Sequence, residues 1–271
     1  MLSVEPNPRV TFRVRHEDDD LLVIEKPARI VTQPGKAHEH DTLLNGLFAL
    51  HGRRLQKLGA SRGFGLVHRL DKETSGVLAV ALSVRGYEGL RAQFERREVR
   101  KSYWAVCRKA PSREKGVVKT PIAEQVIRLN RWSSKKLAKL SSANGKPAVT
   151  AFRVLEESEL AALIEARPLT GRLHQVRLHL DSIGATVLGD AEYGPRSCRH
   201  ASPRLALHAW RLGFDHPVTG EAIDIRTGWP KDLRSLLRRM RLDGPTKQTP
   251  AEDRAGSDEG SHEIAGDTVR E

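Results

Sequence analysis

Short apolar segments that come in pairs constrain the fold of this chain more than any other feature of its sequence. Residues 10–14 alternate between apolar and polar side chains, and residues 21–25 follow as a second short apolar segment after an acidic turn. Residues 149–155 and 161–167 form another such pair. Strands that are close in sequence join as hairpins, so the pattern predicts mainly antiparallel pairing. With helices between the pairs, it indicates an α+β fold.

Apolar residues at helical spacing predict four helices. Asp41 is expected to cap the first, and Thr170 is expected to cap another that runs to Ile183. The other two centre on residues 87–94 and 231–241, where apolar side chains recur every three or four positions. The last helix also carries five basic residues, which makes it a candidate for phosphate contact.

Three stretches lack a clear period. Residues 52–64 are rich in Gly, Arg and Lys and are expected to form a loop, and residues 111–147 are expected to form an irregular insertion. From residue 244 onward Gly, Pro, Ser, Asp and Glu dominate. We therefore predict one folded domain over residues 1–243 and a disordered acidic tail over residues 244–271.

A strongly basic composition narrows the choice of partner. The chain of 271 residues carries a net charge of +12. Residues 244–271 hold three basic side chains against seven acidic ones, which is −4, so the remaining residues carry +16. A protein with this excess is expected to bind a polyanion, and nucleic acid is the commonest one. The alternative is a solvated basic surface that binds nothing specific.

Other classes of protein are disfavoured by the sequence. No apolar run approaches the length of a membrane span, and residues 1–9 lack the apolar stretch of a secretory signal. The two cysteines, Cys107 and Cys198, form no metal-like cluster, and His174 and His179 are spaced too far apart to share a helical face as a metal pair would. A cytoplasmic protein without a metal is therefore expected.

One loop has the composition of a reactive site. Residues 68–76 read HRLDKETSG, and the apolar run at residues 77–82 that follows is short and rich in β-branched side chains, which is typical of a buried strand. Asp71 is then expected on a loop that leads into a rigid strand, where a carboxylate can be presented to a ligand. Arg69 is suited to bind phosphate or to support the acid. The alternative is that Asp71 only caps a turn beside Arg69.

This loop resembles the signature of the RluA family of pseudouridine synthases, RNA-modifying enzymes whose catalytic residue is the aspartate at the position of Asp71. Other segments are similar to family motifs and follow in the family's order: Leu21–Pro27, Lys101–Tyr103, Thr170–Arg177, Gly189-Asp190, Tyr193-Gly194, Leu207–Ala209 and His216-Pro217. The resemblance covers residues 10–230. It implies the pseudouridine synthase fold, a mixed, mainly antiparallel sheet surrounded by helices and loops.

The resemblance also implies roles for three residues. Asp71 is the catalytic residue, and the family mechanism leaves open whether it attacks the sugar or first removes a sugar proton. Tyr103 stacks on the base and assists proton removal from C5, although a strand tyrosine is also a common packing residue. Arg172 pairs with Asp71 and fixes its direction, the alternative being a solvated arginine.

RNA contact is expected from four further residues. Arg69 resembles the residue that enters the RNA stack when the target uridine leaves it. Lys101 shares a strand face with Tyr103, and His68 and Arg177 complete the set. Basic residues between 128 and 139 are further candidates, together with Trp132, which stacks either on an unpaired base or in a core. His174, His179 and His208 are expected to be structural.

Together these features predict a cofactor-free, monomeric RNA pseudouridine synthase that isomerises a uridine in ribosomal or transfer RNA. RluA relatives often carry a small N-terminal S4 domain, and only about ten residues precede the first predicted strand, so we expect this domain to be missing. Departures from the family pattern at Arg29, Leu173 and residues 185–188 bear on loop shape and substrate choice. The alternatives are an RNA-binding or ribosome-assembly module without activity and, less suited to the charge, a glycosidase.

Overall fold

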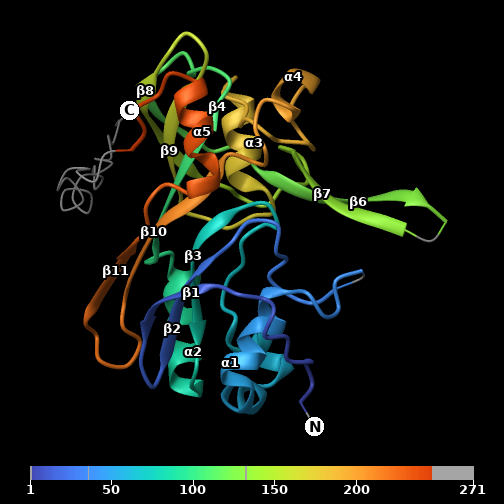
Figure 1. Ribbon diagram of the computed structural model, residues 1–271, viewed down its shortest axis with the longest axis vertical. Coiled ribbons are helices and arrows are strands. Elements are labelled where there is room, and N and C mark those ends of the chain that lie inside the picture. The colour runs from blue at the N-terminus through green and yellow to red at the C-terminus, as the bar shows by residue number, and fades with distance from the viewer. Residues whose placement is uncertain (1, 36, 132, 246–271) are drawn as a thin grey trace, which may run out of the picture.

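The computed structural model describes residues 2–35, 37–131 and 133–245. At its centre is a nine-stranded sheet (Figure 1). Eight of its strands follow one another in the spatial order β1 (Arg13–Glu17), β2 (Leu21–Lys26), β3 (Ser75–Ala81), β10 (Leu207–Asp215), β4 (Arg100–Cys107), β9 (Ala162–Pro168), β8 (Thr150–Glu157) and β5 (Lys115–Val118). The ninth strand, β11 (Ala222–Arg226), pairs with β10. This arrangement confirms the predicted α+β fold with a mixed, mainly antiparallel sheet. None of the helices in the described residues is long and apolar enough to span a membrane.

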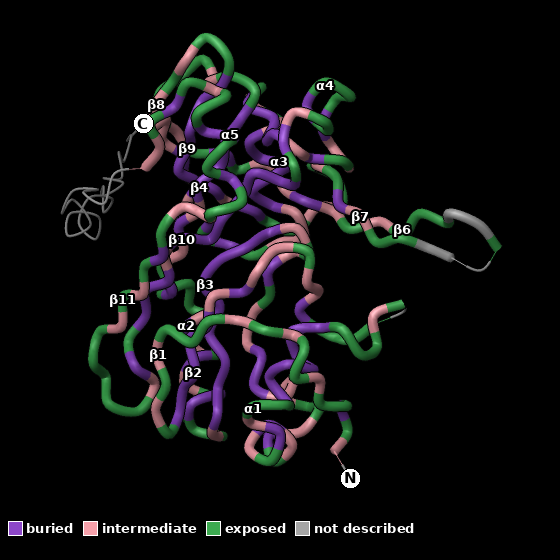
Figure 2. The backbone as a smooth tube through the Cα atoms, viewed as in Figure 1, coloured by how far each residue is buried: buried purple, intermediate pink, exposed green. Residues whose placement is uncertain are grey.

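Two hydrophobic cores pack against the sheet. The first joins side chains of β2 and β3 with those of α1 (Leu43–Leu58) and α2 (Val84–Arg96). The second joins side chains of β4, β8 and β9 with those of α3 (Gln175–Ser182) and α5 (Arg234–Arg239). Strand β10 contributes to both cores, and buried backbone is found in both halves of the molecule (Figure 2). The sheet therefore holds two separately packed halves together.

The two halves meet at a short parallel pair. Among the strands described, only β3 and β10 run parallel, with Ser75 opposite His208 and Gly76 opposite Ala209. Gly76 has a φ of +129°, and a Cβ at this position would lie 2.1 Å from the carbonyl oxygen of Ala209. Only glycine adopts this backbone without strain and leaves room for β10. The loop at residues 68–76, called the signature loop below, therefore has to end in glycine where the two halves meet.

The predicted start and end of the first helix are corrected by the structure. Its N-cap is Thr42, which forms a reciprocal capping box with Asn45, while Asp41 contacts His38 instead. The helix kinks at His51 and continues to Leu58, where the sequence predicted a loop. Apolar side chains of its second half are buried, and this tertiary packing outweighs the locally weak period. The remaining short helices are α4 (Arg196–Arg199) and the 3₁₀ segments Ala60–Gly65 and Lys231–Leu233.

The irregular insertion predicted at residues 111–147 is regular in the structure. It holds β5 and a two-stranded antiparallel hairpin of β6 (Ile122–Asn130) and β7 (Ser133–Leu140), which projects from the body (Figure 1). Among the side chains of this β6–β7 hairpin whose burial is described, Ile122 and Ala138 at its base are buried, whereas Val126 is 69 % exposed. A strand pair exposed on both faces has no buried side to impose an apolar alternation, so residues 122–140 show no period that would indicate strands.

The described end of the chain is attached to the rest of the protein by hydrogen bonds, and the predicted domain boundary stays a prediction. The backbone N–H groups of Asp243 and Gly244 donate to the carboxylate of Glu156. Residues 246–271 lie outside the described residues, as does Trp132, so the predictions for both stay predictions.

Candidate active site

A cavity of about 790 Å³ is lined by residues of both halves of the molecule. The signature loop, residues 168–177 and the base of the β6–β7 hairpin surround it. All seven residues that the sequence predicted for the site line this cavity: His68, Arg69, Asp71, Lys101, Tyr103, Arg172 and Arg177. Its size falls within the usual range of small-molecule sites, so a nucleotide fits in it.

Hydrogen bonds from Thr32 and Lys26 hold the backbone of the signature loop in place. The Thr32 hydroxyl donates to the carbonyl oxygen of Leu70 at 2.7 Å, and the N–H of Thr74 donates to that of Asp71 at 3.1 Å, closing a turn. Lys26 is fully buried, and its Nζ donates to two carbonyl oxygens of its own segment at 2.8 and 2.9 Å and to that of Lys72 at 3.4 Å. These contacts fix the peptide groups on both sides of Asp71.

Burial disfavours the charged form of Lys26. Burial lowers the pKa of its ammonium group to about 7, although the carboxylates of Asp71 and Glu73 favour the charged form. Sequence reasoning missed this residue as part of the site. The only signal for it was its place in the segment Leu21–Pro27, which resembles a family motif.

The arginine beside Asp71 is Arg177, and the predicted pairing of Arg172 with Asp71 is wrong. Arg177 Nη1 lies 3.9 Å from Asp71 Oδ2. Its other nitrogens donate to Asp190 in a bidentate pair at 2.6 and 2.7 Å, and Nη2 lies 2.9 Å from Glu192 Oε2. Burial opposes the charge of Arg177, yet these three carboxylates hold its pKa above the ordinary value. Arg172 instead donates from Nε to the carbonyl oxygen of Pro147 at 3.1 Å.

The exchange of the two arginines follows from where α3 begins. Thr170 does not cap this helix, because its hydroxyl accepts from Val149 N and donates to Gln175 Oε1. The chain turns through His174, whose φ is +54°, and the helix starts at Gln175, four residues later than predicted. Arg177 therefore occupies the first turn of the helix, and Arg172 precedes it.

Tyr103 and Lys101 reach the cavity from the same face of β4. Burial, reinforced by the charge of Asp71, raises the pKa of the Tyr103 phenol above its ordinary value, so the phenol keeps its proton. Lys101 Nζ lies 5.9 Å from the centre of the Phe94 ring and 3.4 Å from the carbonyl oxygen of Thr170. Burial lowers the pKa of Lys101 to about 8. Together they offer an aromatic plane and a cation to a ligand.

The two remaining predicted contacts differ in character. His68 stacks on Phe94, and its Nε2 accepts the N–H of Ala79 at 2.9 Å. Burial lowers the pKa of His68 to about 3, so the ring is neutral and holds the loop against β3. Arg69 is exposed at the rim of the cavity, where its guanidinium is accessible to a ligand.

Four residues near Asp71 were not predicted as site residues: His174, which was expected to be structural, and Asp190, Glu192 and Tyr193. His174 Nε2 lies 3.9 Å from Asp71 Oδ2, and its Nδ1 lies 2.7 Å from the Tyr193 hydroxyl. The segments Gly189-Asp190 and Tyr193-Gly194 resemble family motifs, which was the available signal, whereas nothing in the sequence pointed to Glu192.

Arg29 is the departure from the family pattern that the structure explains in part. Its φ is +67°, in the left-handed region that favours glycine. Its guanidinium donates to the carbonyl oxygen of Pro203 at 2.8 Å. This contact crosses from the N-terminal segment to the one before β10.

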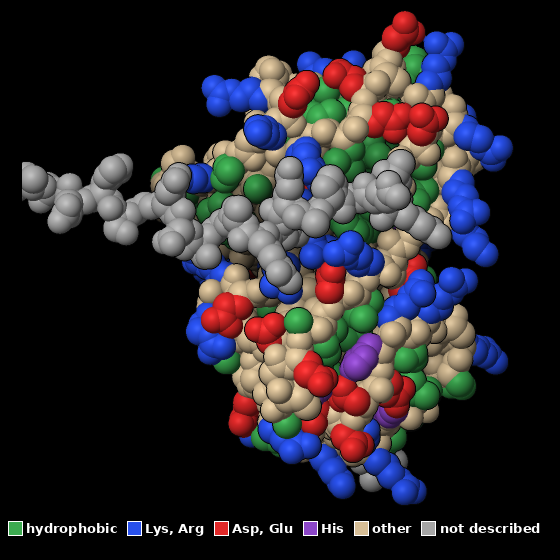
Figure 3. Space-filling view, turned by 90° about the vertical axis from the view of Figure 1, so that its left-hand side faces the viewer, with side chains coloured by type: hydrophobic (Ala, Val, Ile, Leu, Met, Phe, Trp, Pro, Cys, Tyr) green, Lys and Arg blue, Asp and Glu red, His purple; other side chains and the backbone are tan. Residues whose placement is uncertain are grey.

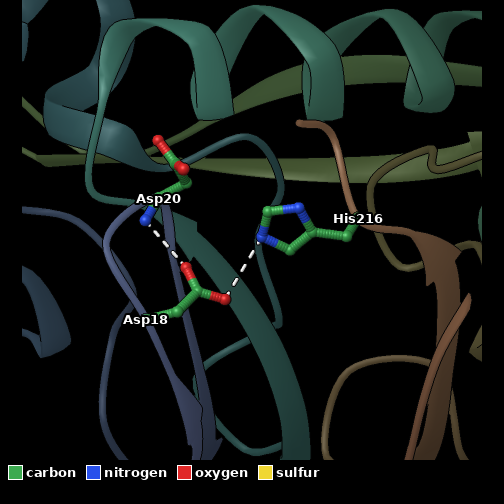
Figure 4. Close-up of side chains that lie close together, drawn as sticks. All are labelled: Asp18, Asp20 and His216. Carbon is green, nitrogen blue, oxygen red and sulfur yellow. Dashed lines mark hydrogen bonds and ion pairs between the residues drawn. The ribbon is translucent and has the colours of Figure 1, made fainter. Parts of the chain in front are cut away.

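A second cluster, Asp18, Asp20 and His216, has the residue types of a metal site but does not fit one (Figure 4). His216 Nδ1 accepts the N–H groups of Val218 and Thr219, so its Nε2 carries the proton that faces Asp18 Oδ2 at 3.2 Å. Asp20 forms a bidentate pair with Arg85. With its ring nitrogens and carboxylates already used, the cluster ties the β1–β2 turn to the β10–β11 turn.

Known proteins resemble this chain over most of its length. A family model described as RNA pseudouridylate synthase matches residues 20–182, more than half of the chain. Ribosomal large subunit pseudouridine synthase D of Zymomonas mobilis is 38 % identical over 240 residues, which cover 86 % of this chain and 74 % of that protein. The uncharacterized RNA pseudouridine synthase YlyB of Bacillus subtilis is 37 % identical over 231 residues, 85 % of this chain and 73 % of that one. The solved structure of human RNA pseudouridylate synthase domain containing 4 has a TM-score of 0.66 and 27 % identity, and covers 86 % of this chain and 95 % of that one.

Proposed function

This chain belongs to the RNA pseudouridylate synthase family and is of the RluA type, an isomerase that acts on RNA, and from this premise we propose that Asp71 converts one specific uridine of large-subunit ribosomal RNA to pseudouridine. The choice of ribosomal RNA is supported by the similarity to ribosomal large subunit pseudouridine synthase D of Zymomonas mobilis. Such a substrate implies a cytoplasmic enzyme. The observation that carries the proposal is the position of Asp71 in the cavity, on a fixed loop and facing Arg177.

The reaction breaks the bond between N1 and C1′ of the uridine, turns the base, and joins C5 to C1′. A carboxylate is suited to either proposed first step, attack on the sugar carbon or removal of a sugar proton. Arg177 offers an opposite charge to Asp71 from a guanidinium that Asp190 and Glu192 hold in place. An arginine fixed in this way keeps the direction of the carboxylate constant while the base is detached and turned.

Tyr103 holds the base in this proposal. Its phenol is protonated and its ring is partly buried between the two cores, so it presents a rigid flat surface to the uracil ring. The protonated phenol makes Tyr103 a poor base before the uridine is bound. We therefore propose that Tyr103 first stacks on the uracil ring. It assists removal of the C5 proton only after Asp71 has lost its negative charge by attacking the sugar or by taking up a sugar proton.

The RNA lies on the side of the molecule that carries the hairpin. Basic and acidic side chains are interspersed on the face opposite the hairpin (Figure 3). At the cavity, Arg69, Lys101 and Arg172 stand around Asp71, and exposed Lys136 continues along the hairpin. A uridine must leave its stack to reach Asp71, and Arg69 at the rim is placed to enter the vacated space. Phosphate contacts by the basic residues fix the register of the strand.

The test is pseudouridine mapping of total RNA from cells that carry the gene intact, deleted, or restored as Asp71→Asn. We expect one uridine of large-subunit ribosomal RNA to lose its modification on deletion and to stay unmodified with Asp71→Asn. Asp19→Asn, the same charge change on an exposed turn, is the control and should restore the site. Modification that persists in Asp71→Asn overturns the role of Asp71, and a lost site in transfer RNA overturns the choice of substrate.

A further inference from the structure

His174 lies between Asp71 and a tyrosine that is held by the hairpin. The imidazole presents Nε2 to Asp71 Oδ2 at 3.9 Å and Nδ1 to the Tyr193 hydroxyl at 2.7 Å. The Tyr193 oxygen also accepts the backbone N–H of Ala138 on β7, at 3.1 Å. One chain of contacts therefore leads from the hairpin to Asp71.

These contacts determine which ring nitrogen of His174 carries the proton. A backbone N–H only donates, so the Tyr193 oxygen is the acceptor toward Ala138 and its own O–H is free to donate. The short distance to Nδ1 makes this nitrogen the acceptor of that O–H. A neutral ring with an accepting Nδ1 carries its hydrogen on Nε2. Burial lowers the pKa of His174 and so favours the neutral ring.

Glu192 is the competing partner of Nδ1. Its Oε2 lies 3.3 Å from that nitrogen, farther away than the Tyr193 hydroxyl. Glu192 is also engaged by Arg177 at 2.9 Å and by Lys135 at 2.5 Å. Both cations favour a carboxylate that stays with them, so Tyr193 determines the tautomer.

We propose that His174 is a positioning residue for the isomerisation: Tyr193, seated by the β6–β7 hairpin, holds its Nε2–H toward Asp71 Oδ2. The proposal rests on the proposed function of Asp71. Arg177 Nη1 approaches the same oxygen at the same distance, 3.9 Å, so two N–H groups turn toward Oδ2 and leave Oδ1 to the substrate. At 3.9 Å the contacts are electrostatic, and they shorten to hydrogen bonds when RNA closes the site.

The seat of the hairpin makes this arrangement sensitive to bound RNA. Ala138 is buried at the base of the hairpin in a small cluster with Ile122, Ala148 and Leu178 of α3. The β6–β7 hairpin, which we expect to contact RNA, is thus packed at its base against α3, the helix that carries Arg177. RNA that holds the hairpin in place also holds Tyr193, and through it the direction of the His174 ring.

Two substitutions at His174 separate its N–H from its bulk. His174→Gln offers an amide N–H at the place of Nε2, whereas His174→Leu offers none, and both side chains meet the same strained backbone. In single-turnover assays on the RNA identified by mapping, we expect His174→Leu to be slower by about 10-fold or more and His174→Gln to stay within about 3-fold of wild type, with unchanged RNA affinity. Equal rates for the two variants overturn the proposal.

Tyr193→Phe provides the second arm of the experiment. It removes the hydroxyl that fixes the tautomer, so it should slow the wild-type enzyme and have no further effect in the His174→Gln background, where no tautomer exists. An equal effect in both backgrounds overturns the link between Tyr193 and the ring.

The tautomer itself is observable without any substrate. Two-bond ¹⁵N–¹H correlation spectra of the wild-type protein, with the His174 signal assigned by its loss in His174→Gln, should show Nε2–H. An Nδ1–H tautomer overturns the proposal even if Asp71 is catalytic. Conversely, activity that survives in Asp71→Asn would remove the proposed function and leave the Nε2–H finding intact.

Discussion

Replacing Gly76 by alanine should disrupt the junction between the two halves of the sheet. The added Cβ would stand 2.1 Å from the carbonyl oxygen of Ala209 and 2.6 Å from its backbone nitrogen, and φ is +129°. The backbone strain costs about 1–3 kcal/mol. Because β3 must also move away from β10 at one of only two residue pairs, we expect a total loss of about 4 kcal/mol in the free energy of unfolding.

Gly220→Ala isolates the backbone part of this effect. Gly220 has a φ of +77° in the β10–β11 turn, and a Cβ there would meet nothing within 4 Å. Its substitution should therefore cost only about 1 kcal/mol. Urea unfolding followed by circular dichroism measures both variants, and thermal scans should show Gly76→Ala melting about 10 °C below wild type.

The comparison also has a functional side. Asp71 lies on the loop that enters β3, so a displaced β3 changes its distance to Arg177, and Gly76→Ala should lose pseudouridine formation while Gly220→Ala keeps it. If Gly76→Ala is no less stable than Gly220→Ala, the close approach of β3 and β10 is not the reason for glycine at this position.

Two further predictions concern the charges around Asp71. Since burial lowers the pKa of Lys26 to about 7, the unfolded chain binds one more proton than the folded chain between pH 7 and about 10, and the wild-type free energy of unfolding should gain about 1.4 kcal/mol per pH unit there from this residue. Urea unfolding at pH 7, 8 and 9 should show that gain to be missing in Lys26→Met, and parallel pH profiles would contradict it. Arg177→Lys loses the bidentate pair with Asp190 and should slow single turnover by about 10-fold or more. Arg172→Lys should keep the turnover rate and alter only the affinity for RNA. The opposite ranking of the two rates would indicate that Arg172 is the partner of Asp71.

Much of the sheet was predictable because its strands carry a one-sided or fully apolar pattern. The segments at residues 149–155 and 161–167 became β8 and β9, and the apolar run after the signature loop became β3. The β6–β7 hairpin escaped prediction because most of it is exposed on both faces. The second half of α1 escaped because Leu55 and Leu58 are buried by contacts from distant parts of the chain.

The candidate site was predictable as a set of residues but not as a set of contacts. Every predicted residue lines one cavity, because the signature loop, β4 and residues 168–177 meet there. The prediction that Arg172 pairs with Asp71 was wrong because the start of α3 was placed at Thr170. Thr170 has a side chain that commonly caps helices, yet its hydroxyl is hydrogen-bonded to Val149 and Gln175. These partners could not be predicted from Thr170 itself.

The seam between β3 and β10 also determines when the site can form as the chain folds. Ser75 and His208, which face each other across it, are 133 positions apart in the sequence. Contacts between such distant residues close late, because the entropy of a long loop must be overcome before they are made. The loop that carries Asp71 leads into this seam. A nascent chain therefore contains the complete signature long before it contains an ordered active site, and only a nearly finished domain can bring Asp71 into its working position.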